Sequence, residues 1–258
     1  MISLFHNQTV RQTIFKNTFW LAVSEAAGRL MTFVLFIYIA RILGAAEFGK
    51  FNFALATVAM FNVLVRFVSP EVVTRELSQD KEKEKEYSSI FSLGIILGLG
   101  SIISVLISSF FIASDPIARK AIWILAAYYI FFNLLEIIYA FLRARQQMEY
   151  ESLVKILDGF LTVVFGLFVI FYFPSVENLS LAFMSAGLMT FFFLMVFFLK
   201  RVLSLRVAWQ RNIWQKFLSL SWPLAFTSFF ALLYTYIDSV MLGYFGQIRE
   251  NGFYNAAY

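Results

Sequence analysis

Any chemistry in this sequence depends on a few charged side chains that interrupt long apolar segments. A charge at the middle of a membrane-spanning helix costs roughly 2.5–3.5 kcal/mol on insertion scales, so each one is a candidate for function. The candidates are Glu25, Arg29, Arg66, Glu136, Asp158 and Asp238.

Arg29 is the deepest of these charges, about 11 residues or roughly 16 Å into the first apolar segment. Glu25 precedes it by four residues and so lies on the same face of a helix. One interpretation is that the two charges only neutralise each other. The other is that Arg29 faces a wet cavity and binds an anionic substrate, while Glu25 orients it. A guanidinium group binds phosphate oxygens in a bidentate manner, which suits pyrophosphate.

The other four charges leave more than one interpretation open. Arg66 either faces the cavity as a second substrate-binding cation or extends to the membrane surface. Glu136 and Asp158 lie near the inner ends of their segments, where ion coupling and helix pairing both fit. Asp238 is the single charge between positions 217 and 245. It could couple a proton or cation, or pair with an arginine from the first half of the chain.

Composition excludes several other kinds of chemistry. The 258 residues are 60% hydrophobic and 14% charged, whereas soluble domains carry about 25% charged residues. There is no cysteine and only one histidine, His6 in the polar amino-terminal tail, so we expect neither a metal site nor a cofactor. The net charge of +5 does not indicate nucleic acid binding, because the basic residues are spread between apolar segments.

Seven apolar segments are long enough to cross a membrane as helices, which need about 20 residues. Their length and continuity favour helices over barrel strands. The first is too long for a signal peptide. The sequence therefore predicts an all-α, polytopic transmembrane helix bundle. The predicted spans are 19–43, 51–69, 87–113, 121–142, 156–173, 179–199 and 217–245.

Basic residues in the connections predict a cytoplasmic amino terminus by the positive-inside rule. The outer connections contain only Lys50, Arg119, Lys120 and Arg249. The inner side holds many more: Arg11, Lys16, Arg75, Lys81, Lys83, Lys85, Arg143, Arg145, Lys155, Lys200, Arg201, Arg206, Arg211 and Lys216. We therefore expect a multi-pass protein of the cell membrane.

A short motif occurs twice, after the first and the seventh predicted spans. Residues 47–54 and 250–257 align without a gap as E-x-G-x-[FY]-N-x-A, and the Leu-Gly pairs Leu43-Gly44 and Leu242-Gly243 precede them. Six spans separate the copies, which is typical of transporters built from two similar halves. We expect residues 1–199 to form a first six-helix lobe. Residues 200–216, with Trp209 and Trp214, would be an interfacial amphipathic linker, and residues 217–258 would begin a second lobe.

Three stretches of the sequence resemble the polysaccharide-biosynthesis flippases. These are the Wzx-type members of the multidrug/oligosaccharidyl-lipid/polysaccharide (MOP) exporter superfamily. The most telling part is Ala40-Arg41-Ile42-Leu43-Gly44 followed by Glu47-Phe48-Gly49, within residues 17–54. Residues 139–158 are similar to the junction of the fourth and fifth spans, and Tyr236-Ile237-Asp238 to the seventh.

The resemblance implies a transporter rather than an enzyme. Its substrate would be an oligosaccharide on a polyprenyl pyrophosphate, moved to the outer leaflet by alternating access without ATP. Family members have twelve to fourteen spans, so the chain would correspond to an amino-terminal fragment. Arg29 falls where such proteins place cavity cations. The bilayer and the lipid-linked oligosaccharide are the implied partners, together with a polymerase and glycosyltransferases of the same pathway.

Three alternatives remain open from the sequence. A drug or metabolite antiporter of the same superfamily would share the fold, but it should prefer acidic cavity residues. A membrane-embedded glycosyltransferase or polymerase would need a large outer loop, whereas the outer connections are short. A noncatalytic membrane scaffold would need only the helices.

Overall fold

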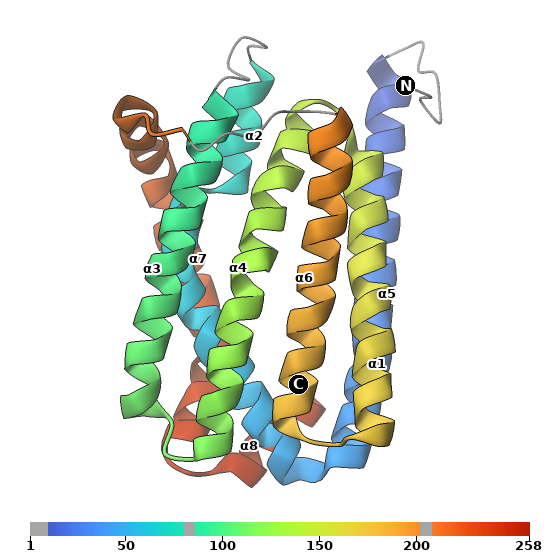
Figure 1. Ribbon diagram of the computed structural model, residues 1–258, viewed down its shortest axis with the longest axis vertical. Coiled ribbons are helices and arrows are strands. Elements are labelled where there is room, and N and C mark those ends of the chain that lie inside the picture. Colours follow the sequence, from blue (N-terminus) through green and yellow to red (C-terminus); the bar gives the residue numbers. More distant parts are fainter. Residues whose placement is uncertain (1–9, 80–85, 202–207) are drawn as a thin grey trace.

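The computed structural model describes residues 10–79, 86–201 and 208–258, and the elements in these ranges are helices that run side by side as one bundle (Figure 1). Two of the elements are short helices at the ends of the bundle, and one is a 3-10 helix. In chain order they are α1 (Val10–Phe61), η1 (Asn62–Phe67), α2 (Pro70–Ser78), α3 (Tyr87–Ile112), α4 (Pro116–Ala144), α5 (Met148–Tyr172), α6 (Val176–Arg201), α7 (Arg211–Tyr244) and α8 (Ile248–Ala257).

Helix α1 consists of two arms joined at Gly44. A straight helix of its 52 residues would be about 78 Å long, well over twice the roughly 30 Å of a hydrocarbon core. Gly44 has φ 76° and ψ 169°, a backbone conformation that residues with a Cβ rarely adopt, and the chain reverses there. Within the described ranges, six helices are long and apolar enough to cross a membrane when α1 is counted once. Its two arms therefore make seven spans, as the sequence predicted.

The start of α4 shows how a turn at this end of the bundle is fixed. Asp115 is the N-cap residue, and its carboxylate accepts hydrogen bonds from Ile117 N at 2.7 Å and Ala118 N at 3.2 Å. Lys50 lies 3.3 Å from the same carboxylate. Burial raises the pKa of Asp115, but these hydrogen bonds and Lys50 outweigh it and hold the pKa below its usual range.

The predicted amphipathic linker differs from the structure in its second half. Residues 211–216 form the first turns of α7 instead of a separate helix, while residues 202–207 lie outside the described ranges. Trp214 donates from Nε1 to the carbonyl of Ser89 at 2.9 Å, and Lys216 lies 3.3 Å from Glu76. Because Trp214 hydrogen-bonds to α3 and Lys216 forms an ion pair with α2, this end of α7 is attached to the bundle.

Helices α1 and α5 approach each other closely through two glycines. A Cβ on Gly159 would lie 3.3 Å from Met31 Sδ and 3.9 Å from Gly28 Cα. Small residues at such a crossing let two backbones pack tightly, as is common between membrane helices. The crossing places Asp158 of α5 beside the stretch of α1 that carries Arg29.

The two copies of the repeated motif pack against each other at the end of the bundle where α1 reverses at Gly44. A Cβ on Gly49 would lie 1.9 Å from the carbonyl oxygen of Ile248, and a Cβ on Gly252 would lie 1.9 Å from that of Ala45. In the gapless alignment Gly49 corresponds to Gly252 and Ala45 to Ile248, so each copy makes the same contact with the other. Asn251 adds a hydrogen bond to Gly49 O at 2.9 Å.

The motif copies also share their internal geometry. The side-chain amide of Asn52 donates to the carbonyl of Phe48 at 2.8 Å, and that of Asn255 donates to the carbonyl of Asn251 at 2.9 Å. The turn before the second copy is made by Gly246, with φ 76° like Gly44. In backbone conformation, the residue that corresponds to Gly44 is therefore Gly246. The sequence had paired Gly44 with Gly243, which instead packs its Cα against the ring of Phe53.

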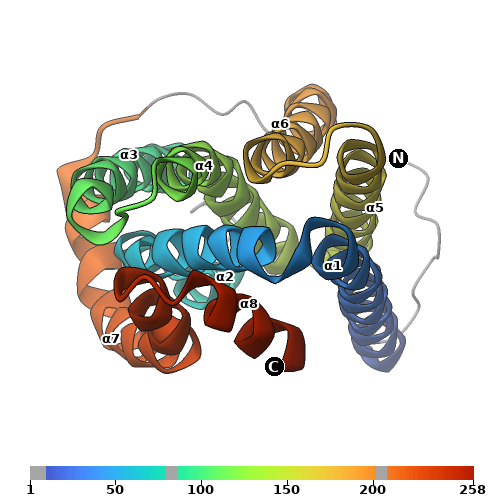
Figure 2. The same ribbon diagram turned by 90° about the horizontal axis from the view of Figure 1, so that it is seen from below.

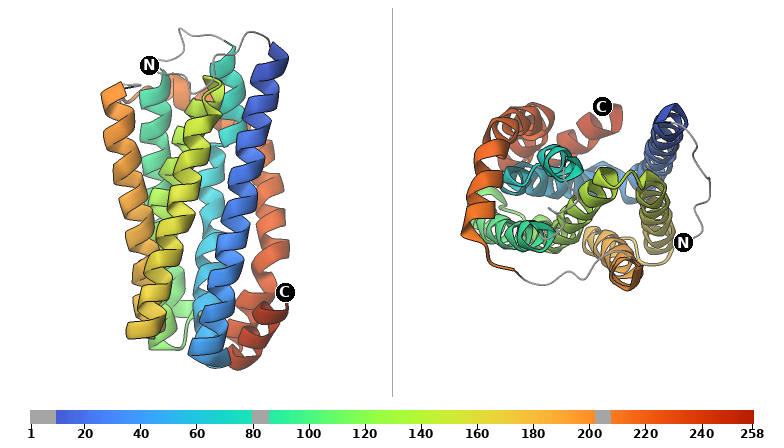
Figure 3. Two further views of the ribbon diagram at one scale, coloured as in Figure 1. Left: turned by 90° about the vertical axis from the view of Figure 1, so that its right-hand side faces the viewer. Right: turned by 90° about the horizontal axis from the view of Figure 1, so that it is seen from above.

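Helices α7 and α8 lie along one side of the bundle, against the second arm of α1 (Figure 2). Viewed from the side and from the other end, α7 stays at the margin of the arrangement (Figure 3). A marginal position suits the first helix of a second lobe. The boundaries at residues 199, 200–216 and 217 remain predictions.

Candidate functional site

A cavity of about 1190 Å³ lies between α1, α4, α5 and α8. Its volume is somewhat above the usual range of ligand sites, about 300–1,000 Å³. Aromatic side chains make up much of the apolar wall: Phe33, Phe36, Phe48, Phe132 and Tyr139. The wall also contains six charged residues: Glu25, Arg29, Arg41, Glu136, Lys155 and Asp158.

One face of α1 supplies a continuous wall of this cavity. Glu25, Arg29, Phe33, Ile37 and Arg41 all line it, and each follows the previous one by four residues. Residues at this spacing share a face of a helix. Arg29 and Arg41 are about 18 Å apart along the helix axis, so the wall presents one cation a turn from Glu25 and another at the opposite end of the series, toward Gly44.

Four of the six residues predicted from the sequence come together at the cavity, and two do not. Glu25, Arg29, Glu136 and Asp158 line it. Arg66 is in η1 and Asp238 is in α7, and neither is a lining residue.

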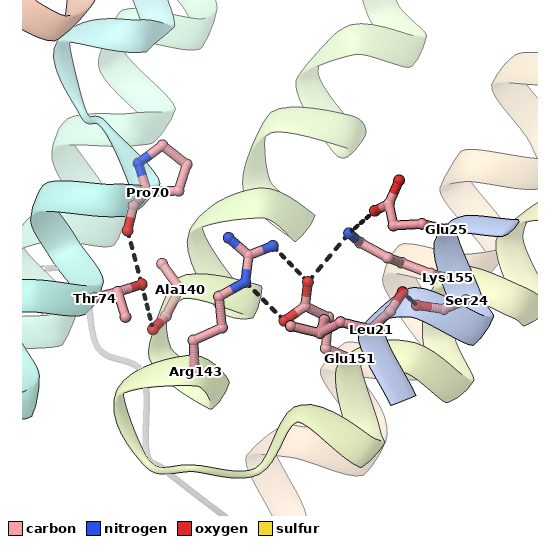
Figure 4. A network of polar contacts seen from close by, with 9 residues as sticks. All are labelled: Leu21, Ser24, Glu25, Pro70, Thr74, Ala140, Arg143, Glu151 and Lys155. Carbon is pink, nitrogen blue, oxygen red and sulfur yellow. Dashed lines mark hydrogen bonds and ion pairs between the residues drawn. The ribbon is translucent and has the colours of Figure 1, made fainter. Parts of the chain in front are cut away.

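Glu25 pairs with Lys155 rather than with Arg29. Lys155 Nζ lies 2.7 Å from Glu25 Oε1 on α1 and 3.2 Å from Glu151 Oε1 on its own helix. Arg143 of α4 donates two hydrogen bonds to the Glu151 carboxylate, one from Nε to Oε2 at 2.8 Å and one from a terminal guanidinium nitrogen to Oε1. Figure 4 shows the resulting chain of charges, Arg143–Glu151–Lys155–Glu25, running from α4 through α5 to α1.

From Glu151 to Glu25, the burial of these groups decreases along that chain. Glu151 is fully buried, the side chain of Lys155 is 21% exposed and that of Glu25 is 54% exposed. A buried carboxylate must be paired, and Arg143 does this with both oxygens of Glu151. The part of the network that borders the cavity is therefore Lys155 with Glu25.

Arg29 and Arg41 are exposed in the cavity, and neither forms an ion pair with a described residue. Arg29 forms no direct ion pair with Glu25 among the described residues, although its charge still acts on that carboxylate. The cavity wall carries three acidic and three basic residues, so formal charge alone does not select the sign of a ligand. Arg29 and Arg41 are, however, the cations with unengaged guanidinium groups.

Asp158 and Glu136 occupy a more buried part of the wall. Thr190 of α6 lies beside the Asp158 carboxylate, whose Oδ1 accepts no hydrogen bond from the described residues. Glu136 lies on α4 among the lining residues Phe132, Leu135 and Tyr139. An acceptor left open beside a cavity could take up a proton or a cation.

Asp238 and Arg66 have surroundings of their own. The Tyr254 hydroxyl donates to Asp238 Oδ2 at 2.7 Å, so the carboxylate joins α7 to α8. Arg66 is half-buried at the end of η1, close enough to Glu71 of α2 to act on its charge. Asp238 pairs with no arginine among the described residues.

Sequence reasoning missed two lining residues, Lys155 and Arg41. Lys155 was assigned to an inner connection, but it lies in the second turn of α5. Its four-residue spacing from Glu151 was the available signal. Arg41 was noticed only as part of a motif, although it continues the four-residue series that starts at Glu25.

A bundle of membrane-length helices around a large charged cavity defines a multi-pass membrane protein of transporter architecture, and comparison with known proteins agrees. The sequence profile of the family described as "Polysaccharide biosynthesis protein" matches residues 14–258. The chain belongs to this family. No curated protein matches it.

Solved structures show the fold of the MOP superfamily. A MATE multidrug transporter, DinF-BH, solved in complex with a ligand, has 14% sequence identity and a TM-score of 0.74, covering 99% of this chain and 61% of that one. A MOP superfamily transporter from Pyrococcus furiosus, described as having a binding pocket of reverse polarity, has 20% identity and a TM-score of 0.63. That match covers 83% of this chain and 52% of the other, so the chain spans only about half to three fifths of these neighbours.

Proposed function

We propose that the protein acts in flipping a polyprenyl-pyrophosphate-linked oligosaccharide from the cytoplasmic to the outer leaflet of the cell membrane, by alternating access. The observation that carries the proposal is Arg29, which is exposed in the wall of a cavity large enough for several sugar rings and forms no ion pair with a described residue. Membership of the polysaccharide biosynthesis family supports a glycan as the cargo.

The charges of the cavity suit the two ends of such a substrate. Guanidinium groups bind phosphate oxygens in a bidentate manner, and Arg29 lies where a pyrophosphate would be held within the membrane. Aromatic rings such as Phe33, Phe132 and Tyr139 offer flat apolar faces for sugars and lipid. Arg66 contributes to substrate binding only if the cavity widens toward η1, so we assign the head group to Arg29 first.

Orientation and coupling complete the proposal. The amino terminus is cytoplasmic, because the basic connections lie on that side. Asp158 and Glu136 are the coupling candidates that reach the cavity, whereas Asp238 connects α7 to α8. A polymerase and glycosyltransferases of the same pathway are the protein partners that this function requires.

Replacing Arg29 tests the substrate role. Arg29→Ala should abolish export of the cell-surface glycan while membrane insertion is kept, because loss of a charge lowers the insertion cost. Arg29→Lys should restore export only in part, since an ammonium group keeps the charge without the bidentate geometry. Normal glycan export by a well-expressed Arg29→Ala protein would contradict the proposal.

Export of a cationic compound is the second candidate, because Glu136 and Asp158 face the same cavity. In that case Asp158→Asn should abolish resistance to a cationic dye while Arg29→Ala leaves it intact. The two functions thus predict opposite sensitivities of the same two residues.

A further inference from the structure

We propose that Lys155 is a second anion-binding residue of the cavity, and that the Glu25 carboxylate holds it in place of the substrate when the cavity is empty. The proposal rests on the proposed function, because it assigns to Lys155 and Arg29 together the pyrophosphate that the substrate carries.

Lys155 can leave its partners at little cost in free energy. Glu151 keeps both oxygens paired through Arg143 when Lys155 moves away. Glu25 is 54% exposed, so its carboxylate can turn toward water in the cavity. Neither acid is left buried and unpaired, which is the situation that makes breaking an ion pair costly.

Glu25 already occupies the position of an anion between two cations, Lys155 and Arg29. Its carboxylate lies 2.7 Å from Lys155 Nζ, and Arg29 projects from the same face of α1 one turn further along. A phosphate group that displaced this carboxylate would meet Lys155 from α5 and Arg29 from α1. Glu25 therefore behaves as an internal competitor for the head-group site.

The spacing of charge on the ligand determines how well it engages two cations on facing helices. A pyrophosphate carries charge on two linked phosphates, and two cations from facing helices can each hold one of them. A monophosphate offers a single centre and can engage the pair less fully. Lys155 therefore favours pyrophosphate over phosphate lipids.

Lys155 also lies where binding of the substrate would change the contacts between α1 and α5. Its Nζ is 5.7 Å from the centre of the Tyr139 ring, another lining residue, so the ammonium can be attracted to that ring when Glu25 releases it. Toward the inner end, α1 is attached to the α4–α5 turn by Lys16–Glu149 at 3.2 Å and Asn17–Gln146 at 2.8 Å. The Lys155–Glu25 pair is a third polar connection of α1 to this region, and the one that lies deepest. It is lost when the ligand displaces Glu25 from Lys155.

The test measures binding rather than transport, with the membrane-embedded chain in lipid nanodiscs and farnesyl pyrophosphate as the probe. Lys155→Met should weaken binding about tenfold or more, since a charge-assisted hydrogen bond is lost. Lys155→Arg should retain most of the affinity. Lys120→Met is the matched control, because Lys120 pairs with Glu177 at 3.3 Å outside the cavity, and it should leave binding unchanged.

Glu25→Gln separates competition from a structural role. If Glu25 competes with the ligand, its neutral variant should bind farnesyl pyrophosphate severalfold more tightly, and the gain should shrink in the Lys155→Met background. If the Glu25–Lys155 pair only holds α1 against α5, Glu25→Gln should lower the melting temperature and leave affinity equal or weaker. That second result would overturn the proposal.

Two further outcomes are decisive. Wild-type discrimination between farnesyl pyrophosphate and farnesyl phosphate should fall in Lys155→Met, and equal discrimination by the two proteins would overturn the role of Lys155. If Lys155→Met does not fold, Lys155→Gln, which keeps a donor for Glu151, replaces it with the same expectation. A wild-type chain that binds neither lipid contradicts the proposed function itself, not the assignment of Lys155 alone.

Discussion

A single methyl group added at Gly49 should force apart the two copies of the repeated motif. The new Cβ would lie 1.9 Å from Ile248 O and 2.9 Å from Gly252 N, both backbone atoms that no rotamer change can move. The helices would have to separate by about 1.5 Å to reach ordinary contact. Such overpacking costs roughly 1–3 kcal/mol, and loss of the Asn251 hydrogen bond to Gly49 O adds about 1 kcal/mol.

A loss of about 3 kcal/mol corresponds to a melting temperature lower by roughly 6–12 °C for a protein of this size. The assay is thermal unfolding of Gly49→Ala in detergent, followed by size-exclusion chromatography. Gly252→Ala should behave alike, because its Cβ would lie 1.9 Å from Ala45 O. Gly98→Ala is the control: nothing lies within 4 Å of its Cβ, so it should be neutral or slightly stabilising. A Gly49→Ala protein that melts like Gly98→Ala would refute this reading of the contact.

Three more predictions address orientation, the buried ion pair and the N-cap of α4. In the cysteine-free chain, Ser175→Cys should react with an impermeant thiol reagent on intact cells and Ser78→Cys only after the membrane is opened; the reverse would overturn the orientation. Arg143→Leu should destabilise the protein by roughly 3–5 kcal/mol because Glu151 is left buried with Lys155 alone, and adding Glu151→Leu should recover most of the loss in a melting assay. Asp115→Ala should cost about 1 kcal/mol at neutral pH. Since the folded pKa of Asp115 is depressed, its contribution exists above the ordinary carboxyl pKa and disappears as pH falls through the folded value, so wild type and variant should converge in acid unfolding.

The number and order of the spans could be predicted from the sequence because lipid imposes one strong rule on them. Backbone polar groups must be paired within each segment, so apolar length alone identifies the helices. The rule does not determine at which residues each helix begins and ends. It left residues 211–216 outside the last span, although Trp214 and Lys216 are held by α3 and α2 as part of α7.

The candidate site was predictable in part, for reasons seen in particular residues. Arg29, Glu25, Glu136 and Asp158 were identified because a charge within an apolar segment stands out. The partner of Glu25 was not, since Lys155 is 130 residues away in sequence and meets it only through the packing of α5 on α1. The four-residue spacing had favoured Arg29 as the partner of Glu25. In the structure both side chains line the cavity, and Glu25 pairs with Lys155.

The reciprocal contact between Gly49 and Gly252 bears on how such a chain could have arisen. Because each motif copy touches the other through equivalent atoms, the contact has the form of a two-fold interface between identical subunits. A six-helix unit with one copy of the motif would make this same contact with a second molecule of itself, and duplication would place both copies in one chain. The paired glycines thus have the geometry of a dimer interface, and a substitution at either one must be accommodated by the helix opposite.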